Sequence, residues 1–158
     1  MTAATLKTAR AIANLNDGVI VATVEIAASP ERVFRALTTA ELAQWWGEEG
    51  VYRVTDHRAD LRAGGSWISR GRSADGTAFS VSGTILEIEP PRRLVQTWKY
   101  DWEGGGETRL TYRLDQIEGG TRLTVRHEGF ADPKAGQSHV SGWEKVLGWL
   151  VVHLAETR

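Results

Sequence analysis

The sequence predicts an α+β domain in which a curved antiparallel sheet wraps around a long C-terminal helix, with two short helices after the first strand. Hydrophobic and polar side chains alternate for about eighty residues after Gly47, which is typical of an antiparallel sheet with one solvated face. Residues 137–156 carry an apolar stripe at helical spacing. Because the inner face of the sheet is the only large apolar surface available to this helix, the helix must lie across it.

Length and composition set the limits of this prediction. The chain has 158 residues, 41% of them hydrophobic, which suits one domain with one core. Its 19 Lys and Arg balance 20 Asp and Glu, so no overall field favours nucleic acid or acidic lipid as a partner. The absence of cysteine excludes disulfides and thiol chemistry. No signal peptide and no apolar run of about 20 residues is present, so we expect a cytoplasmic protein with no membrane partner.

The first elements can be placed in order. Residues 1–17 show only weak helical spacing, and we expect a disordered or helical N-terminal arm ahead of a single domain at 18–158. Val19–Ala27 alternates as a strand. Ser29–Glu31 supplies a capping hydroxyl, a first-turn proline and an acid, so a helix begins there. A second short helix begins near Thr39 and ends at Gly47.

The sheet region is divided by glycine-containing turns, which predict a meander of hairpins. These turns lie at 64–65, 75–76, 104–106 and 119–120. The alternation reverses across 86–89, which predicts a β-bulge. Four arginines share the outer face of two strands with acidic residues, which predicts a solvated face with cross-strand ion pairs. They are Arg109, Arg113, Arg122 and Arg126.

The last predicted element is a helix from about Gln137 to Glu156. Its apolar stripe consists of Trp143, Val146, Leu147, Leu150, Val151 and Leu154. Trp149 lies off this stripe, and together with exposed edge strands it permits a homodimer.

Six segments, taken in order, resemble the START-like or SRPBCC superfamily, and within it the branch named after the activator of the ninety-kilodalton heat-shock protein ATPase. They are Ala28–Leu37, Leu42–Trp46, Asp60–Trp67, Glu87–Trp98, Leu123–Phe130 and Gly142–Trp143. The resemblance implies a helix-grip fold whose seven-stranded sheet grips the final helix around a hydrophobic cavity. It implies no fixed reaction. The eukaryotic activator contacts its chaperone largely through a further N-terminal domain, so for this chain we expect no chaperone partner.

The candidate site is the space between sheet and final helix, which bulky aromatic side chains must either fill or line. The chain has seven Trp against three Phe and three Tyr, and such rings offer apolar area together with a polar atom. Strand parity points Gln96, Tyr112 and His127 inward among leucines and valines. The predicted binding residues are Trp46, Trp67, Phe79, Gln96, Trp98, Tyr112, His127, His139, Trp143 and Leu147. We therefore expect a cavity that binds a small hydrophobic or aromatic molecule.

The sequence leaves two alternatives to ligand binding open. One is a cyclase- or hydrolase-type enzyme in which Tyr112, His127 or His139 moves protons. The other is a chaperone-associated interaction module. His127 and Glu128 are strand neighbours that face opposite sides, so they form no catalytic dyad.

The histidine and acid spacings predict no metal site, and no cofactor is expected. Asp56, His57 and Asp60 lie near a predicted turn, where we expect them to be solvated.

Overall fold

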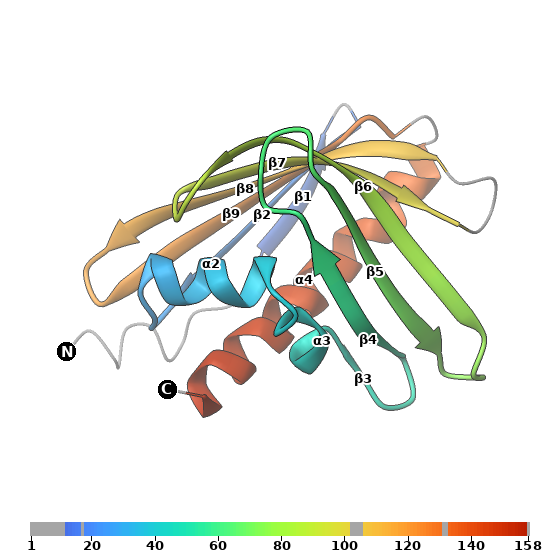
Figure 1. Ribbon diagram of the computed structural model, residues 1–158, viewed down its shortest axis with the longest axis horizontal. Helices are drawn as coiled ribbons and strands as arrows, with labels where there is room; N and C mark the ends of the chain where they lie inside the picture. The colour runs from blue at the N-terminus through green and yellow to red at the C-terminus, as the bar shows by residue number, and fades with distance from the viewer. Residues whose placement is uncertain (1–11, 17, 102–105, 131–132, 158) are drawn as a thin grey trace.

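The computed structural model describes residues 12–16, 18–101, 106–130 and 133–157, and shows one curved antiparallel sheet with the helices on its concave side (Figure 1). Within these residues the sheet has nine strands, in the order β1-β2-β9-β8-β7-β6-β5-β4-β3. The strands are β1 (Ile12–Asn16), β2 (Val19–Ile26), β3 (Gly47–Glu48), β4 (Tyr52–Ala59), β5 (Ser66–Ser73), β6 (Ala78–Glu89), β7 (Arg93–Tyr100), β8 (Glu107–Ile117) and β9 (Gly120–Glu128). The helices are α2 (Pro30–Thr38), α3 (Leu42–Trp45) and α4 (Pro133–Glu156).

The strand count exceeds the expected seven because each edge of the sheet carries one short extra strand. β2 and β4–β9 make up seven strands, and β1 and β3 pair with the outer members. The expectation of a disordered or helical arm is therefore wrong for residues 12–16. Gly18, at a φ of 75°, reverses the chain so that β1 runs antiparallel to β2. Residues 1–11 and 17 lie outside the described part of the chain.

The helix pair after β2 begins as predicted. The Ser29 hydroxyl accepts a hydrogen bond from the Arg32 amide at 3.2 Å, and Pro30 occupies the first turn of α2. Helix α3 is a single turn that carries Trp45 and ends at Trp46. Gly47 has a φ of 126°, and a Cβ there would lie 2.3 Å from the Tyr52 carbonyl oxygen. Only glycine therefore allows the chain to pass from α3 into the sheet so closely.

Helix α4 begins at Pro133, one turn earlier than predicted, because proline is well accommodated at the start of a helix. The stripe residues Trp143, Val146, Leu147, Leu150 and Leu154 are buried, and Val151 is half-buried. The helix packs mainly against β1 and β2 at one side of the sheet. The inner faces of β4–β8 consequently extend beyond the helix.

Two β-bulges determine which side chains of the sheet face inward. The register shifts between Ile85 and Glu87, which confirms the reversal predicted there. A second shift lies between Val54 and Asp56 in β4. Val54 and His57 are both buried although they are three residues apart, which strict alternation would place on opposite faces. The expectation that His57 is solvated is therefore wrong, because this bulge turns it inward.

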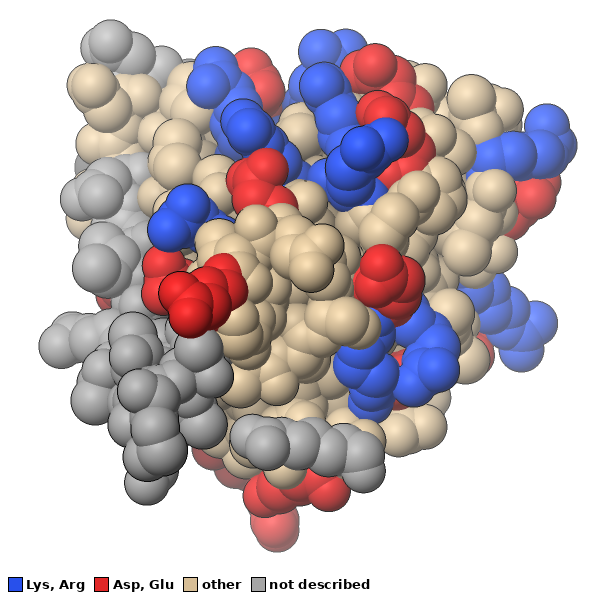
Figure 2. All heavy atoms as spheres, turned by 90° about the vertical axis from the view of Figure 1, so that its left-hand side faces the viewer, with Lys and Arg blue, Asp and Glu red and all other residues tan. Residues whose placement is uncertain are grey.

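The outer face of the sheet carries ion pairs. Arg122 of β9 contacts Glu25 of β2 at 3.0 Å, which is a cross-strand pair as predicted, whereas Arg126 contacts Glu128 at 3.0 Å within β9. Asp60 is exposed and pairs with Arg62, in agreement with the prediction that it is solvated. Basic and acidic side chains also lie intermixed on the face drawn in Figure 2. Neither sign of charge dominates that face.

A carboxylate with little exposure ties the short helices to the end of α4. Glu41 Oε2 accepts hydrogen bonds from Arg32 Nη2 at 2.7 Å and from His153 Nε2 at 2.6 Å, and its Oε1 accepts from Arg32 Nη1 at 3.0 Å. Burial by itself would raise the pKa of Glu41, but the bonds from Arg32 and His153 outweigh burial and lower it. Glu41 therefore links α2 and the start of α3 to the C-terminal part of α4.

Replacing Glu41 by Gln is expected to lower the free energy of unfolding by about 1–3 kcal/mol at pH 7, since it weakens hydrogen bonds to a charged group. Urea unfolding monitored by circular dichroism measures this loss. Glu89→Gln is the matched control, because the Glu89–Arg92 pair is 62% and 71% exposed. Its removal should change stability by less than about 0.5 kcal/mol. Equal losses of stability in the two variants would show that the hydrogen bonds of Glu41 contribute no more than an exposed ion pair.

Candidate functional site: a cavity beneath the C-terminal helix

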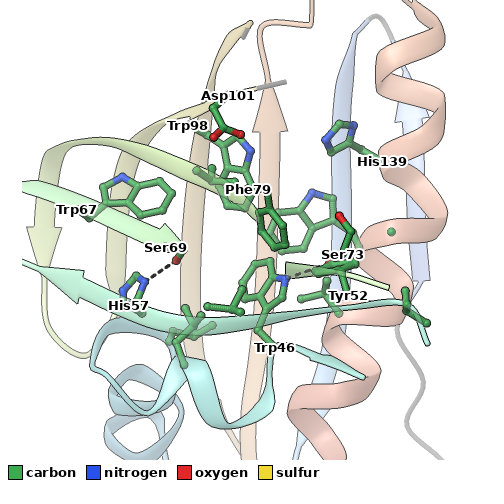
Figure 3. A pocket seen from close by; sticks show the side chains of 18 of the residues that line it. Trp46, Tyr52, His57, Trp67, Ser69, Ser73, Phe79, Trp98, Asp101 and His139 are labelled. Atoms are coloured by element: carbon green, nitrogen blue, oxygen red, sulfur yellow. Dashed lines mark hydrogen bonds between the residues drawn. The ribbon is translucent and has the colours of Figure 1, made fainter. Parts of the chain in front are cut away.

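A cavity of about 600 Å³ lies between α4, the short helices and the inner faces of β4–β8. Figure 3 shows aromatic side chains from several of these elements pointing into the same space. The wall residues that are exposed, Thr77, Ala78 and Asp101, mark the open side. The volume is within the range of small-molecule sites, which is about 300–1,000 Å³.

Three indole rings form the centre of the aromatic wall. The ring centroids of Trp46 and Trp98 are 6.0 Å apart, those of Trp98 and Trp143 are 6.0 Å apart, and those of Trp46 and Trp143 are 5.8 Å apart. Trp67 extends the wall, with its centroid 5.6 Å from that of Trp98. These rings come from α3, β5, β7 and α4, so the cavity depends on contacts between distant parts of the chain.

Hydrogen bonds fix three of the indoles in the wall. Trp46 Nε1 donates to the Tyr52 hydroxyl at 3.1 Å, and Trp67 Nε1 donates to the Thr97 carbonyl at 3.0 Å. Trp143 Nε1 donates to His127 Nδ1 at 3.0 Å. Since each bond uses the only polar atom of its indole, these rings present apolar surface to the cavity.

Other polar groups on the wall keep hydrogen-bonding capacity. The Gln96 side chain is 7% exposed and Tyr112 is 2% exposed. Among the described residues, no hydrogen bond joins the Gln96 amide or the Tyr112 hydroxyl to another group, and the polar atoms of both side chains remain accessible from the cavity. Burial raises the pKa of Tyr112, so its hydroxyl keeps its proton at neutral pH. Each of these groups can donate a hydrogen bond to a bound molecule and accept one from it.

His57 and Ser69 form a polar pair on the same wall (Figure 3). They lie opposite each other on β4 and β5, and His57 Nδ1 is 2.7 Å from Ser69 Oγ. Burial lowers the pKa of His57 to about 4, so the ring is neutral at pH 7. Sequence reasoning missed this pair, because only the β4 bulge brings His57 to the inner face.

The structure brings eight of the ten predicted site residues to the cavity wall. These eight are Trp46, Trp67, Phe79, Gln96, Trp98, Tyr112, His139 and Trp143. The prediction that His127 and Leu147 line the cavity is wrong. Leu147 is fully buried in the core, because Gly142, Trp143 and Val146 form the side of α4 that faces the cavity.

His127 is fully buried behind Trp143. Because its Nδ1 accepts the Trp143 N–H, the proton of the neutral ring is on Nε2, which donates to Thr108 Oγ1 at 2.6 Å. The Thr108 hydroxyl donates in turn to the Trp98 carbonyl at 3.2 Å. Burial, with a smaller contribution from the charge of His139, lowers the pKa of His127 to about 3. His127 thus positions Trp143.

Three further features concern Trp149, the possible metal ligands and the length of the helices. Trp149 is half-buried, and its ring packs edge-on against Tyr52 with centroids 5.7 Å apart, so it has a partner within the chain. Across the described ranges, no three His, Asp or Glu side chains gather closely enough to hold a metal ion. None of the described helices is long and apolar enough to span a membrane.

A curved antiparallel sheet that grips a C-terminal helix around a cavity defines a START-like, or SRPBCC, domain. The chain belongs to the family described as Activator of Hsp90 ATPase homolog 1-like protein, whose model matches residues 27–155. This family is the branch of the superfamily that the six sequence segments resemble.

Individual relatives support the same assignment. The human activator of 90 kDa heat shock protein ATPase homolog 1 is 26% identical over 118 residues, which cover 74% of this chain and 31% of the human protein. The chain thus matches about a third of that relative's length. A Rhodobacter sphaeroides protein has a TM-score of 0.81 and 26% identity over 94% of this chain and all of its own. The AHSA1 protein of Silicibacter pomeroyi has a TM-score of 0.75 and 28% identity, with 89% of this chain and 99% of its own covered.

Proposed function

We propose that this protein binds a small hydrophobic or aromatic molecule in the cavity beneath α4. The observation that carries the proposal is a space of about 600 Å³, walled by three mutually contacting indoles and open at one side. Buried aromatic surface favours an apolar guest, while a few polar groups on the wall can orient it. The cytoplasmic location that the sequence predicts and the homodimer that it permits remain predictions.

The geometry disfavours two of the histidines, His127 and His57, in proton-transfer chemistry of the kind considered above. His127 lies behind Trp143 with both ring nitrogens engaged, so it cannot exchange a proton with a guest. His57, with a pKa of about 4, is a weak base at neutral pH. A chaperone-associated role rests on the names of the family and of the human relative, and pull-down of the chaperone by this chain would test it.

Replacing Gly142 by Leu is expected to weaken binding of a neutral aromatic guest at least tenfold. Gly142 is on the cavity wall, and a Cβ there would meet nothing within 4 Å, so a leucine can occupy space that the guest needs. The probe is N-phenylnaphthylamine, whose fluorescence increases in apolar surroundings, titrated into the wild-type protein and the variant.

Gly148→Leu is the matched control, because Gly148 is an exposed glycine of the same helix with equally open surroundings. Both substitutions remove a glycine from a helix interior and should stabilise the fold by about 0.5–1 kcal/mol. Only Gly142→Leu should affect the probe. Failure of the wild-type protein to bind, or an equal effect of the two substitutions, would overturn the proposal.

A further inference from the structure

The cavity wall contains polar groups whose hydrogen bonds the protein itself leaves unmade. Gln96 and Tyr112 are 7% and 2% exposed, and no hydrogen bond joins the Gln96 amide or the Tyr112 hydroxyl to another described group. No side-chain polar atom of the described residues is both fully buried and without a partner, so the polar atoms of Gln96 and Tyr112 remain accessible from the cavity. A guest in the cavity can therefore supply the hydrogen bonds that the protein does not make.

The two groups lie close enough to act on a single atom of a guest. Tyr112 on β8 pairs with Leu94 on β7, and Gln96 follows two residues later on the same inner face. Such diagonal neighbours are about 7–8 Å apart at their Cα atoms, within reach of long side chains. A carbonyl oxygen can accept from both groups, and a hydroxyl can donate to the Gln96 oxygen while it accepts from Tyr112.

The deep part of the cavity is suited to an uncharged guest. Among the described wall residues, Asp101 is exposed at the open side, where it accepts a hydrogen bond from Ser80 at 3.0 Å. His139, also on the wall, is half-buried on α4. His57 is neutral, and burial raises the pKa of both Tyr52 and Tyr112, so these tyrosines keep their protons. A charged guest would lose its hydration there, and neither Gln96 nor Tyr112 would supply a counter-ion.

The volume and the walls limit the size and shape of the guest. An engineered cavity of about 150 Å³ holds one benzene ring, so the cavity of about 600 Å³ has room for about three fused rings. Indole faces at centroid spacings of 5.8–6.0 Å offer offset or edge contacts to a flat ring system.

We infer that the guest is an uncharged fused aromatic molecule with a hydroxyl or carbonyl oxygen, which Gln96 and Tyr112 bind at the inner end of the cavity. This inference rests on the proposed function and adds the chemical class of the guest. The oxygen gives the guest a fixed orientation, with the ring system against Trp46, Trp98 and Trp143 and the far edge towards the open side.

Three probes with the same tricyclic skeleton test the inference by calorimetric titration: fluorenone, fluorene and fluorene carboxylate. Fluorenone should bind wild-type protein at least tenfold more tightly than fluorene, although fluorene is the more hydrophobic molecule. The carboxylate should bind most weakly. In the Gln96→Leu/Tyr112→Phe double variant, the preference for fluorenone should fall to about twofold or less, because neither side chain can then donate to the carbonyl.

The double variant should fold as stably as the wild-type protein, because the polar groups it removes make no hydrogen bond to another described group. Gln116→Leu, at an exposed position of β8, is the matched control and should leave all three affinities unchanged. The Gln96 side-chain amide gives a second readout in wild-type protein, since fluorenone should shift its NMR signals more than fluorene does.

The outcomes separate the two proposals. Equal affinities for fluorene and fluorenone, or a preference that survives in the double variant, would overturn the polar anchor and leave a purely apolar cavity. Tightest binding of the carboxylate would overturn the uncharged class of guest. If none of the three probes binds, both this inference and the proposed function are wrong.

Discussion

Acidification from pH 6.5 to 4.5 is expected to lower the free energy of unfolding by about 4 kcal/mol through two buried histidines alone. The folded protein keeps His57 and His127 neutral, with pKa values of about 4 and about 3, whereas both take up protons near pH 6.5 when the chain unfolds. The unfolded chain therefore binds more protons, and stability falls as the pH falls from 6.5 towards these values. The loss is comparable with the whole stability of a small domain.

Urea unfolding between pH 7 and 4.5 measures this dependence. His57→Gln should remove about 1.4 kcal/mol per pH unit from its slope, the contribution of one proton. Nitrogen NMR should show His127 as the Nε2–H tautomer throughout this range. A slope that is the same in the variant and the wild-type protein would show that surface groups, rather than His57, cause the pH dependence.

Replacing His127 by Leu is expected to cost about 2–4 kcal/mol at pH 7, where the histidine is neutral. The leucine fills similar space but leaves the buried Trp143 N–H without an acceptor and removes a donor to Thr108. Because Trp143 is part of the cavity wall, we also expect weaker binding of N-phenylnaphthylamine. Urea unfolding and the probe titration measure the two effects.

A double-mutant cycle separates the hydrogen bond from simple packing. In the His127→Leu/Trp143→Phe variant no indole N–H remains to be satisfied, so the combined cost should be smaller than the sum of the single costs by about 1–2 kcal/mol. Strictly additive costs would show that the Trp143–His127 bond does not couple the two residues.

The sequence predicted much of the candidate site because aromatic side chains at inward strand positions have few alternatives to the space beneath the last helix. Strand parity correctly placed Trp98, Gln96 and Tyr112 on the inner face. It could not distinguish a side chain on the cavity wall from one behind that wall. His127 has the same parity as Tyr112, but the indole of Trp143 covers it.

His57 shows a different limit of periodicity. The register shift in β4 adds one residue between two buried positions, and the sequence of that strand carries no glycine or proline that marks it. Strand β1 was missed for a similar reason, because its pairing depends on the free edge of β2 rather than on its own weak pattern. The bulge in β4 and the strand β1 both arise from interactions between strands.

The sequence by itself determined the α+β class, the two short helices, the bulge in β6 and the long helix, because alternation, caps and apolar stripes are local. Only the tertiary structure decided that an open space remains, that Gln96 and Tyr112 border it without partners, and that His127 supports the wall from behind. Volume and hydrogen-bond partnership depend on how segments far apart in the chain approach one another, and local sequence patterns do not record those distances.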